Sequence, residues 1–557
     1  MKPSIRTTLP LCLVLFCFTG FPVVAQTPPL ERTLSITANN EDLDDFLKRL
    51  GTQAGCVFSY SPSAVDVNRR VSKSFNQQTT REILETVFEG TVALKQKGNY
   101  IIITKAPAHE LLVSGYVVDE SSGEKIRSAS VYDPITLRST TTDEFGYFQL
   151  KMKSTPEDYK LIIRKVDYND TVMVSSASPS TFQKFKVKLD PALDSFTEGV
   201  SNQATKFWRW TKSSVAKMNI NNVRDTIHRT WQVSLVPFVG TNRKLSGNVT
   251  NDWSINILGG YSAGTEKAEL GLLFNINTGS VKYAQVASIF NLNGGFVLGA
   301  QLAAISNINL DSTRAVHIAA IANITAKSMN GLQLAAVTNF TGKNATGAQI
   351  AAVANVSGKE VSGAQISALV NIAPRVNGVQ IGLFNITDSI KGVPIGFMSF
   401  VGKGYHTLEL STDEVLPLNF GFRTGIRQFY NILTAGLRTE QADSVTWAFG
   451  YGVGSSPRLS KNLWLNLDLT SHQMNKGNVE ALNVVNRFYA GIDWQLTKGL
   501  ALSAGPTLAF RVYDTSYPSH PETFWSFKPR IRYEEFDATS NIGMQWWWGF
   551  RLGLRVL

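Results

Sequence analysis

Cysteine is scarce in this chain, and its two first copies lie where a secretory leader is expected. Three cysteines occur among 557 residues, and Cys12 and Cys17 fall within the first 25. Residues 1–25 combine a basic start, an apolar stretch and a small-residue site at Val23-Val24-Ala25, which predicts a cleaved signal peptide. Cleavage would leave Cys56 alone. We therefore predict an exported chain without an internal disulfide.

Long hydrophobic runs are also missing after the leader. No stretch of 18 apolar residues follows residue 25, so a membrane-spanning helix is not expected. A chain of this kind can cross a bilayer only as a closed β-barrel, because that fold pairs every backbone polar group internally.

Signs of catalysis are sparse. The six histidines show no metal-ligand spacing, and Cys-x-x-Cys pairs and glycine-rich phosphate loops do not occur. Ser471-His472 resembles part of a hydrolase site, but no third partner can be named, so a barrel lipid hydrolase is only a further alternative. We expect no enzyme, no cofactor and no metal.

Positive charge is in modest excess and is scattered. Lys and Arg number 54 against 43 Asp and Glu, a net charge of +11, which falls to +9 once Lys2 and Arg6 leave with the leader. Without a basic block, and in an exported chain, nucleic acid is not an expected partner. Outer-membrane lipid, through anionic or lipopolysaccharide phosphate, is the expected one.

What the chain has in abundance is a repeat. A motif close to Gly-x-Gln-(Ile/Leu/Val)-Ala-x-x-x-Asn occurs nine times, at intervals of 16 residues that shorten to 15 and 14 at the end. A fixed period indicates one structural unit repeated. The copies begin at Lys267, Tyr283, Gly299, Ala315, Gly331, Gly347, Gly363, Gly378 and Gly392.

Each repeat alternates like a strand with one apolar and one weakly polar face. In the Gly331 copy one face holds Leu332, Leu334, Ala336 and Phe340, and the other holds Gln333, Ala335, Val337 and Asn339. We predict that the polar positions form rows of amides along a wall, as structural residues that could line a lumen. These wall positions are Gln285, Gln301, Gln333, Gln349, Gln365, Gln380, Asn291, Asn307, Asn323, Asn339, Asn355 and Asn371. His317 replaces glutamine in the fourth copy.

Residues 229–557 as a whole favour a transmembrane barrel. In the last strand Phe550, Leu552, Leu554 and Val556 alternate with Gly549, Arg551, Gly553 and Arg555, as lipid-facing and lumen-facing residues would. With one strand per repeat in 267–401, we predict roughly 18 to 20 strands. The alternative is a β-solenoid, which explains identical intervals more naturally. Against it, 16 residues is short for a coil, and the C-terminal third does not repeat.

Residues 31–105 predict a small α+β domain. A strand precedes a helix with Leu43, Phe46, Leu47 and Leu50 on one face, and Thr79-x-x-Glu82 is a capping box that opens a second helix. The order of elements, with the Tyr100-Ile-Ile-Ile103 strand at its end, resembles the secretin and TonB N-terminal short domain. That resemblance implies a periplasmic location and, in some receptors, signalling to an inner-membrane regulator.

Residues 110–190 predict a small β-sandwich. Val113-x-Gly115 and Thr142-Asp143-x-x-Gly146-x-Phe148 resemble the carboxypeptidase-regulatory-like domain, a non-catalytic module common before outer-membrane receptors of Bacteroidota-type bacteria. Asp143 can cap its turn while Gly146 takes a backbone angle that other residues resist. Large nutrient receptors carry a plug domain after this module, and residues 191–228 leave no room for one.

The linker and the repeats complete the sequence-based prediction. Phe207-Trp-Arg-Trp-Thr-Lys212 suits a membrane interface or a helix across a barrel mouth. Gly378-Val-Gln-Ile-Gly-Leu-Phe-Asn385 resembles a bacterial surface-repeat family that implies no activity. We expect a non-enzymatic outer-membrane pore or receptor whose periplasmic domains dock a partner and could signal. The alternative is a surface structural or adhesion protein built on a solenoid.

Overall fold

The computed structural model describes residues 27–62, 64–89, 91–105, 110–153, 158–176, 182–187, 214–223, 226–439, 445–477, 479, 482–516, 529–537 and 539–556. The chain divides into two compact units, Met1–Ala192 and Leu193–Leu557. The signal-peptide and 207–212 predictions lie outside the described residues. Within the described ranges, no helix has the length and apolar content to span a membrane.

The first domain of unit 1 has the predicted helices and one strand that the sequence did not reveal. Thr79 and Glu82 form the capping box reciprocally, at 2.9 and 3.2 Å. The first helix starts after Asp42 and ends at Gly55, which has the left-handed conformation. The elements are η1 (Pro29–Glu31), β1 (Thr33–Asp42), α1 (Leu43–Ala54), β2 (Val57–Tyr60), the unforeseen β3 (Arg70–Thr79), α2 (Thr80–Phe88), β4 (Val92–Lys97) and β5 (Tyr100–Lys105).

The second domain of unit 1 is a two-sheet β-sandwich, with strand orders β11-β10-β7-β8 and β12-β6-β9. The Asp143 carboxylate accepts the backbone N–H groups of Phe145 and Tyr147, both at 2.9 Å, and Gly146 has a φ of +71°. The predicted roles of Asp143 and Gly146 in this turn are thus confirmed. The strands are β6 (Glu110–Asp119), β7 (Ser130–Tyr132), β8 (Ser139–Thr141), β9 (Tyr147–Lys153), β10 (Asp158–Arg164), β11 (Thr171–Ser176) and β12 (Phe182–Val187).

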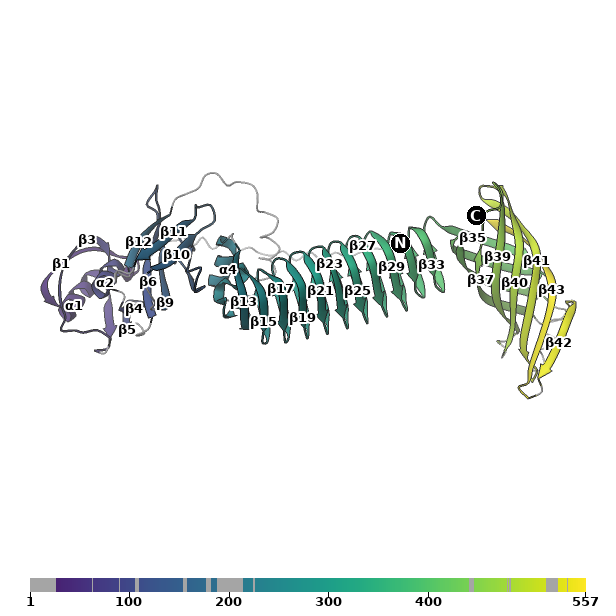
Figure 1. Ribbon diagram of the computed structural model, residues 1–557, viewed down its shortest axis with the longest axis horizontal. Coiled ribbons are helices and arrows are strands. Elements are labelled where there is room, and N and C mark those ends of the chain that lie inside the picture. Colours follow the sequence, from purple (N-terminus) through teal and green to yellow (C-terminus); the bar gives the residue numbers. More distant parts are fainter. Residues whose placement is uncertain are drawn as a thin grey trace, which may run out of the picture. The chain divides into compact units, whose positions relative to one another are not determined.

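The repeats in unit 2 form a parallel β-solenoid, which corrects the prediction that they are barrel strands. Each coil contributes one strand to a 12-stranded sheet and one to a 10-stranded sheet, and residues one period apart pair in parallel register, as in Gln333↔Gln349 (Figure 1). In each coil the chain turns a corner between the two sheets, which in the Gly331 copy lies at Ala336-Val337. This corner divides the single strand predicted for each repeat into two strands. For this reason Val337 turns outward, whereas Gln333, Ala335 and Asn339 point inward as predicted.

Glycine opens most repeats because neighbouring coils approach closely there. Gly331 has a φ of +132°, and a Cβ added to it would lie 2.2 Å from the carbonyl oxygen of Ala315. A side chain at this position would therefore clash with the backbone of the preceding coil.

The 12-stranded sheet, here sheet one, contains β13 (Ile227–Val236), β14 (Val239–Gly240), β15 (Val249–Asn256), β17 (Gly264–Gly271), β19 (Val281–Ala287), β21 (Val297–Ala303), β23 (Thr313–Ala319), β25 (Met329–Ala335), β27 (Ala345–Ala351), β29 (Glu360–Ser367), β31 (Arg375–Ile381) and β33 (Ser389–Ile395). Sheet two contains β16 (Gly259–Ser262), β18 (Phe274–Asn277), β20 (Phe290–Asn293), β22 (Ser306–Asn309), β24 (Ala322–Thr325), β26 (Thr338–Thr341), β28 (Ala354–Ser357), β30 (Val370–Ile372), β32 (Phe384–Thr387) and β34 (Met398–Val401).

Both ends of the solenoid are covered. Helix α4 (Ser214–Asn222) and the 3-10 helix η2 (Arg243–Asn248) lie at its start, where Ile220 packs against the cluster of Tyr261, Ile276 and Leu292. At its end, Ser399 donates its N–H to the Asn431 side chain at 2.9 Å and accepts the Thr424 hydroxyl at 2.9 Å. Open sheet edges are prone to edge-to-edge association, and these contacts protect them.

The C-terminal part of unit 2 is a closed antiparallel barrel of eight strands, not 18 to 20. It closes because β43 pairs with both β41 and β35, while β42 extends beside β43. The count was wrong because it assigned a wall strand to every repeat. The strands are β35 (Tyr405–Thr412), β36 (Leu418–Ile426), β37 (Phe429–Thr439), β38 (Val445–Ser455), β39 (Leu463–Lys476), β40 (Asn483–Thr497), β41 (Leu500–Asp514), β42 (Ile531–Asp537) and β43 (Ile542–Val556).

Candidate functional site: an amide-lined solenoid and a charged barrel

The predicted glutamine positions form a hydrogen-bonded row inside the solenoid. The Gln349 Nε2 donates to Gln333 Oε1 at 2.8 Å, and Gln365 Nε2 donates in turn to Gln349 Oε1 at 2.8 Å. Every glutamine of the predicted wall has 0% exposure. The structure therefore brings these residues together, but in a sealed interior rather than along a lumen.

The asparagine positions form a second row and connect the two sheets. The Asn339 Nδ2 donates to Asn355 Oδ1 at 2.9 Å, within sheet two, and to the backbone oxygen of Ile350 in sheet one, at 2.8 Å. The other predicted asparagines are also fully buried. Both amide donors and the acceptor are thereby used, which a buried amide requires.

Three other residue types occupy the glutamine position: Glu269 and Pro394 at the two ends of the row, and His317, which interrupts it. Glu269, in the first copy, accepts Gln285 Nε2 at 2.8 Å, and burial raises the pKa of its carboxyl group. His317 has a buried Nε2 without a hydrogen-bond partner, and burial lowers its pKa from 6.5 to about 4. Gln333 occupies the equivalent position in the following coil, and its Nε2 donates instead to the Thr325 hydroxyl at 3.2 Å.

The barrel interior is a network of buried ion pairs. Glu409 pairs with Arg423, Arg551 and Arg555, and Arg423 also contacts Asp468 at 2.7 Å. The sequence analysis did not single out the acidic partners, Glu409 on β35 and Asp468 on β39, although both alternate with apolar residues along their strands. An eight-stranded barrel has an interior just wide enough for side chains to fill.

The barrel exterior has the opposite character. Phe550, Leu552, Leu554 and Val556 are exposed, whereas Arg551 and Arg555 are buried, as the alternation of the last strand predicts. The other strands show the same pattern, with exposed Leu408, Phe420, Phe449, Leu469, Phe488, Ile492 and Trp494.

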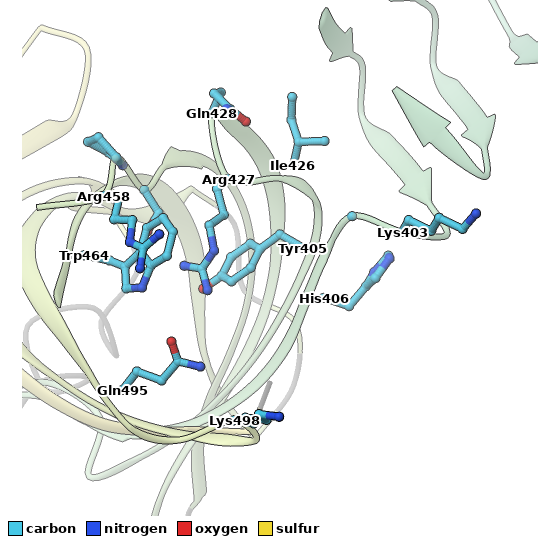
Figure 2. A pocket seen from close by; sticks show the side chains of 13 residues that line it. Lys403, Tyr405, His406, Ile426, Arg427, Gln428, Arg458, Trp464, Gln495 and Lys498 are labelled. Carbon is cyan, nitrogen blue, oxygen red and sulfur yellow. The ribbon is translucent and has the colours of Figure 1, made fainter. Parts of the chain in front are cut away.

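A basic pocket of about 560 Å³ lies at one mouth of the barrel (Figure 2). Arg427 lies between two aromatic rings, 4.5 Å from the Tyr405 centroid and 3.7 Å from that of Trp464. Arg458 approaches the same indole at 5.3 Å, and Lys403 and Lys498 complete the cationic lining. None of the described residues that line the pocket carries a carboxylate, so its chemistry suits an anion.

The remaining candidates from the sequence do not assemble into a reactive site. Ser471 is exposed on the barrel wall and His472 is buried inside it, so the two side chains lie on opposite faces of β39. Cys56 is partly buried, which raises the pKa of its thiol to about 11. Within the described ranges, no group of three or more His, Cys, Asp and Glu side chains could hold a metal ion.

Comparison with known proteins supports the assignment of one domain. Residues 113–198 match the model of the CarboxypepD_reg-like domain family. No curated protein and no solved structure matches the chain significantly. The resemblance that the sequence suggested for the β-sandwich is thus confirmed, and that of residues 31–105 stays a prediction.

Proposed function

We propose that the protein is a non-enzymatic outer-membrane protein whose closed barrel anchors the solenoid and the N-terminal domains. One observation carries this proposal: the eight-stranded barrel exposes apolar side chains and buries ion pairs. Contiguous apolar surface of this extent on a soluble protein would promote association. A bilayer removes that surface from water, while paired charges inside the wall avoid contact with lipid.

The filled interior supports an anchor or receptor rather than an open pore. Arg423 and Arg555 are both 0% exposed and share Glu409. A water-filled channel would require these charges to separate and the interior to reorganise, at a cost of several kcal/mol per unpaired buried ion.

We further propose that the N-terminal unit docks a periplasmic or inner-membrane regulatory protein. Its two domains share a polar contact, in which the Tyr147 hydroxyl donates to Glu85 at 2.6 Å and the Tyr116 hydroxyl donates to Glu31 at 3.2 Å. Buried hydrogen bonds of this kind favour one rigid docking body. The resemblance of residues 31–105 to the short domain of signalling receptors supports the periplasmic location.

The basic pocket supports lipid phosphate as a partner of the anchor. Substituting Arg427→Gln and Arg458→Gln should reduce binding to vesicles that contain anionic lipid, compared with zwitterionic vesicles. Equal binding of the variant and the wild type to both vesicle types would rule out this role of the pocket.

A surface structural or adhesion role is the second candidate, because the repeats do stack into a solenoid. This role would place the solenoid, and with it the N-terminal unit, on the outer face of the membrane, so it excludes the periplasmic docking proposed above. Binding of intact cells to immobilised host or matrix surfaces, with and without residues 229–401, would test it.

Heat-modifiable migration on gels and conductance in planar bilayers test the anchor. We expect detergent-dependent folding, a mobility shift on boiling and no stepwise conductance. Stepwise conductance would establish a pore and refute the closed anchor. A protein that folds and stays soluble without detergent would refute membrane insertion.

A further inference from the structure

The solenoid has the inverse of the usual distribution of polar and apolar residues. Its interior holds rows of buried glutamine and asparagine beside a small apolar cluster that includes Met329 and Val361, and its outer surface around the corner is apolar. Three outward columns hold only Leu, Ile, Val or Phe in all nine copies. The corner column, for example, contains Leu273, Ile289, Ile305, Ile321, Val337, Val353, Leu369, Leu383 and Phe397.

The opposite edge of the coils is charged from Asp311 onwards, and most of its charges are positive. Lys327, Lys343, Lys359 and Arg375 lie on successive coils, stacked through backbone bonds such as Lys343 N to Lys327 O at 3.0 Å. Lys327 pairs with Asp311 at 3.0 Å and Arg375 pairs with Glu360 at 3.4 Å. Lys343 and Lys359 lie between these pairs on adjacent coils, about 4.8 Å apart, and repel one another unless further anions approach. Lys403 lies at the same edge of the last coil, where it pairs with Asp388 at 3.2 Å, and it also lines the pocket at the barrel mouth.

We propose that the solenoid lies in one leaflet of the bilayer, with its apolar corner among the acyl chains and its basic edge at the anionic head groups. This inference rests on the proposed membrane anchor and adds a second lipid contact to it. The occupant of the apolar surface is therefore lipid, and the charge of the basic edge is complementary to lipid phosphate.

Backbone hydrogen bonding at the corner allows this placement. Non-helical backbone in hydrocarbon is tolerated only when its polar groups are satisfied. At the corner, Ile321 N donates to Ile305 O at 3.0 Å and Val353 N donates to Val337 O at 3.1 Å. The coil-to-coil pairing thus satisfies backbone donors even where the strands turn.

The depth of the apolar surface fits one leaflet. From Leu332, the first outward apolar residue of its coil, to the corner at Val337 is five residues, or about 16–17 Å at a strand rise of about 3.3 Å. The hydrocarbon core of a bilayer is about 30 Å thick, so this depth is close to half of it.

At the start of the solenoid, helix α4 covers part of this apolar surface. Tyr261, Ile276 and Leu292 belong to the outward column of sheet two, and they are buried in a cluster that includes Ile220 of α4. Further along that column Phe340, Ile386 and Phe400 remain exposed. Leu408 and Leu410 of β35, the strand that follows the last coil, are exposed as well.

Site-directed spin labelling of the full chain tests this placement. In a Cys56→Ser background that also lacks residues 1–25, and with them Cys12 and Cys17, single labels would be attached through Val337→Cys at the corner, Lys343→Cys at the basic edge and Leu552→Cys on the barrel. The protein would be reconstituted in phosphatidylethanolamine/phosphatidylglycerol vesicles. Collisions with oxygen, which partitions into lipid, and with a water-soluble nickel chelate would be measured at each label.

We expect the oxygen-to-nickel collision ratio at residue 337 to match that at residue 552 and to exceed that at residue 343. A ratio at 337 equal to that at 343, with 552 still protected from nickel, would place the solenoid in water and overturn this inference alone. Low collision rates with both reagents at 337 would show a second copy or a protein partner there, which also overturns it. Nickel access at 552 would overturn the membrane anchor itself.

Discussion

Repairing the interrupted glutamine row by His317→Gln should stabilise the solenoid. His317 pairs in register with Gln301 on one side and Gln333 on the other. A glutamine there can donate to Gln301 and accept from Gln333, as Gln349 does with its own neighbours at 2.8 Å. The substitution therefore replaces one unsatisfied buried nitrogen by two hydrogen bonds.

The gain can be estimated from the cost of an unsatisfied buried group, which is about 1–3 kcal/mol. A second contribution depends on pH. Because burial lowers the pKa of His317 from 6.5 to about 4, the unfolded chain binds a proton that the folded solenoid rejects. Wild-type stability therefore decreases as the pH falls from 6.5 towards 4, by up to about 3 kcal/mol at about 1.4 kcal/mol per pKa unit.

Hydrogen exchange of peptides from β21 to β27 is the appropriate assay, since a chain of several domains need not unfold in one step. After correction for intrinsic exchange rates, His317→Gln should raise the opening free energy at pH 7 and remove its decrease at low pH. The reciprocal variant Gln349→His is the matched control and should introduce both defects. A destabilised His317→Gln variant, or an unchanged pH profile, would refute the reasoning.

Three further predictions concern the barrel and the N-terminal unit. Leu552→Arg places a charge on the lipid face, which should lower the free energy of unfolding by about 2–4 kcal/mol if the residue lies near the bilayer midplane. Urea titration of the heat-modifiable band measures this change, and an unchanged value would contradict lipid exposure. Glu409→Gln leaves Arg423, Arg551 and Arg555 without their shared anion. The same titration should therefore show a free energy of unfolding lower by about 3–5 kcal/mol, and an unchanged value would contradict the network. Burial raises the pKa of Glu85, so the stability that its neutral form provides is lost as the pH rises above 4.5. Glu85→Gln, an isosteric change, should therefore slow hydrogen exchange of α2 at pH 7 but not at pH 4, and faster exchange at pH 7 would refute this.

Local structure was predictable wherever short-range chemistry decides it. The capping box at Thr79, the turn at Asp143 and Gly146, and the alternation around Arg551 all have their predicted roles, because each depends on neighbours within a few residues. By contrast, β3 was missed, since Arg70–Thr79 reads RVSKSFNQQT and alternates weakly. It becomes a strand by pairing with β1.

The amino-acid sequence by itself determined the period of the repeat and the inward position of its Gln and Asn side chains. It could not decide between parallel stacking and antiparallel barrel pairing, because alternation along a strand is the same in both. Tertiary structure decided this through the corner at Ala336-Val337, which lets each residue pair with the one a period later. That pairing seals the amides inside, brings the basic residues of successive coils into one row, and leaves eight strands to close the barrel.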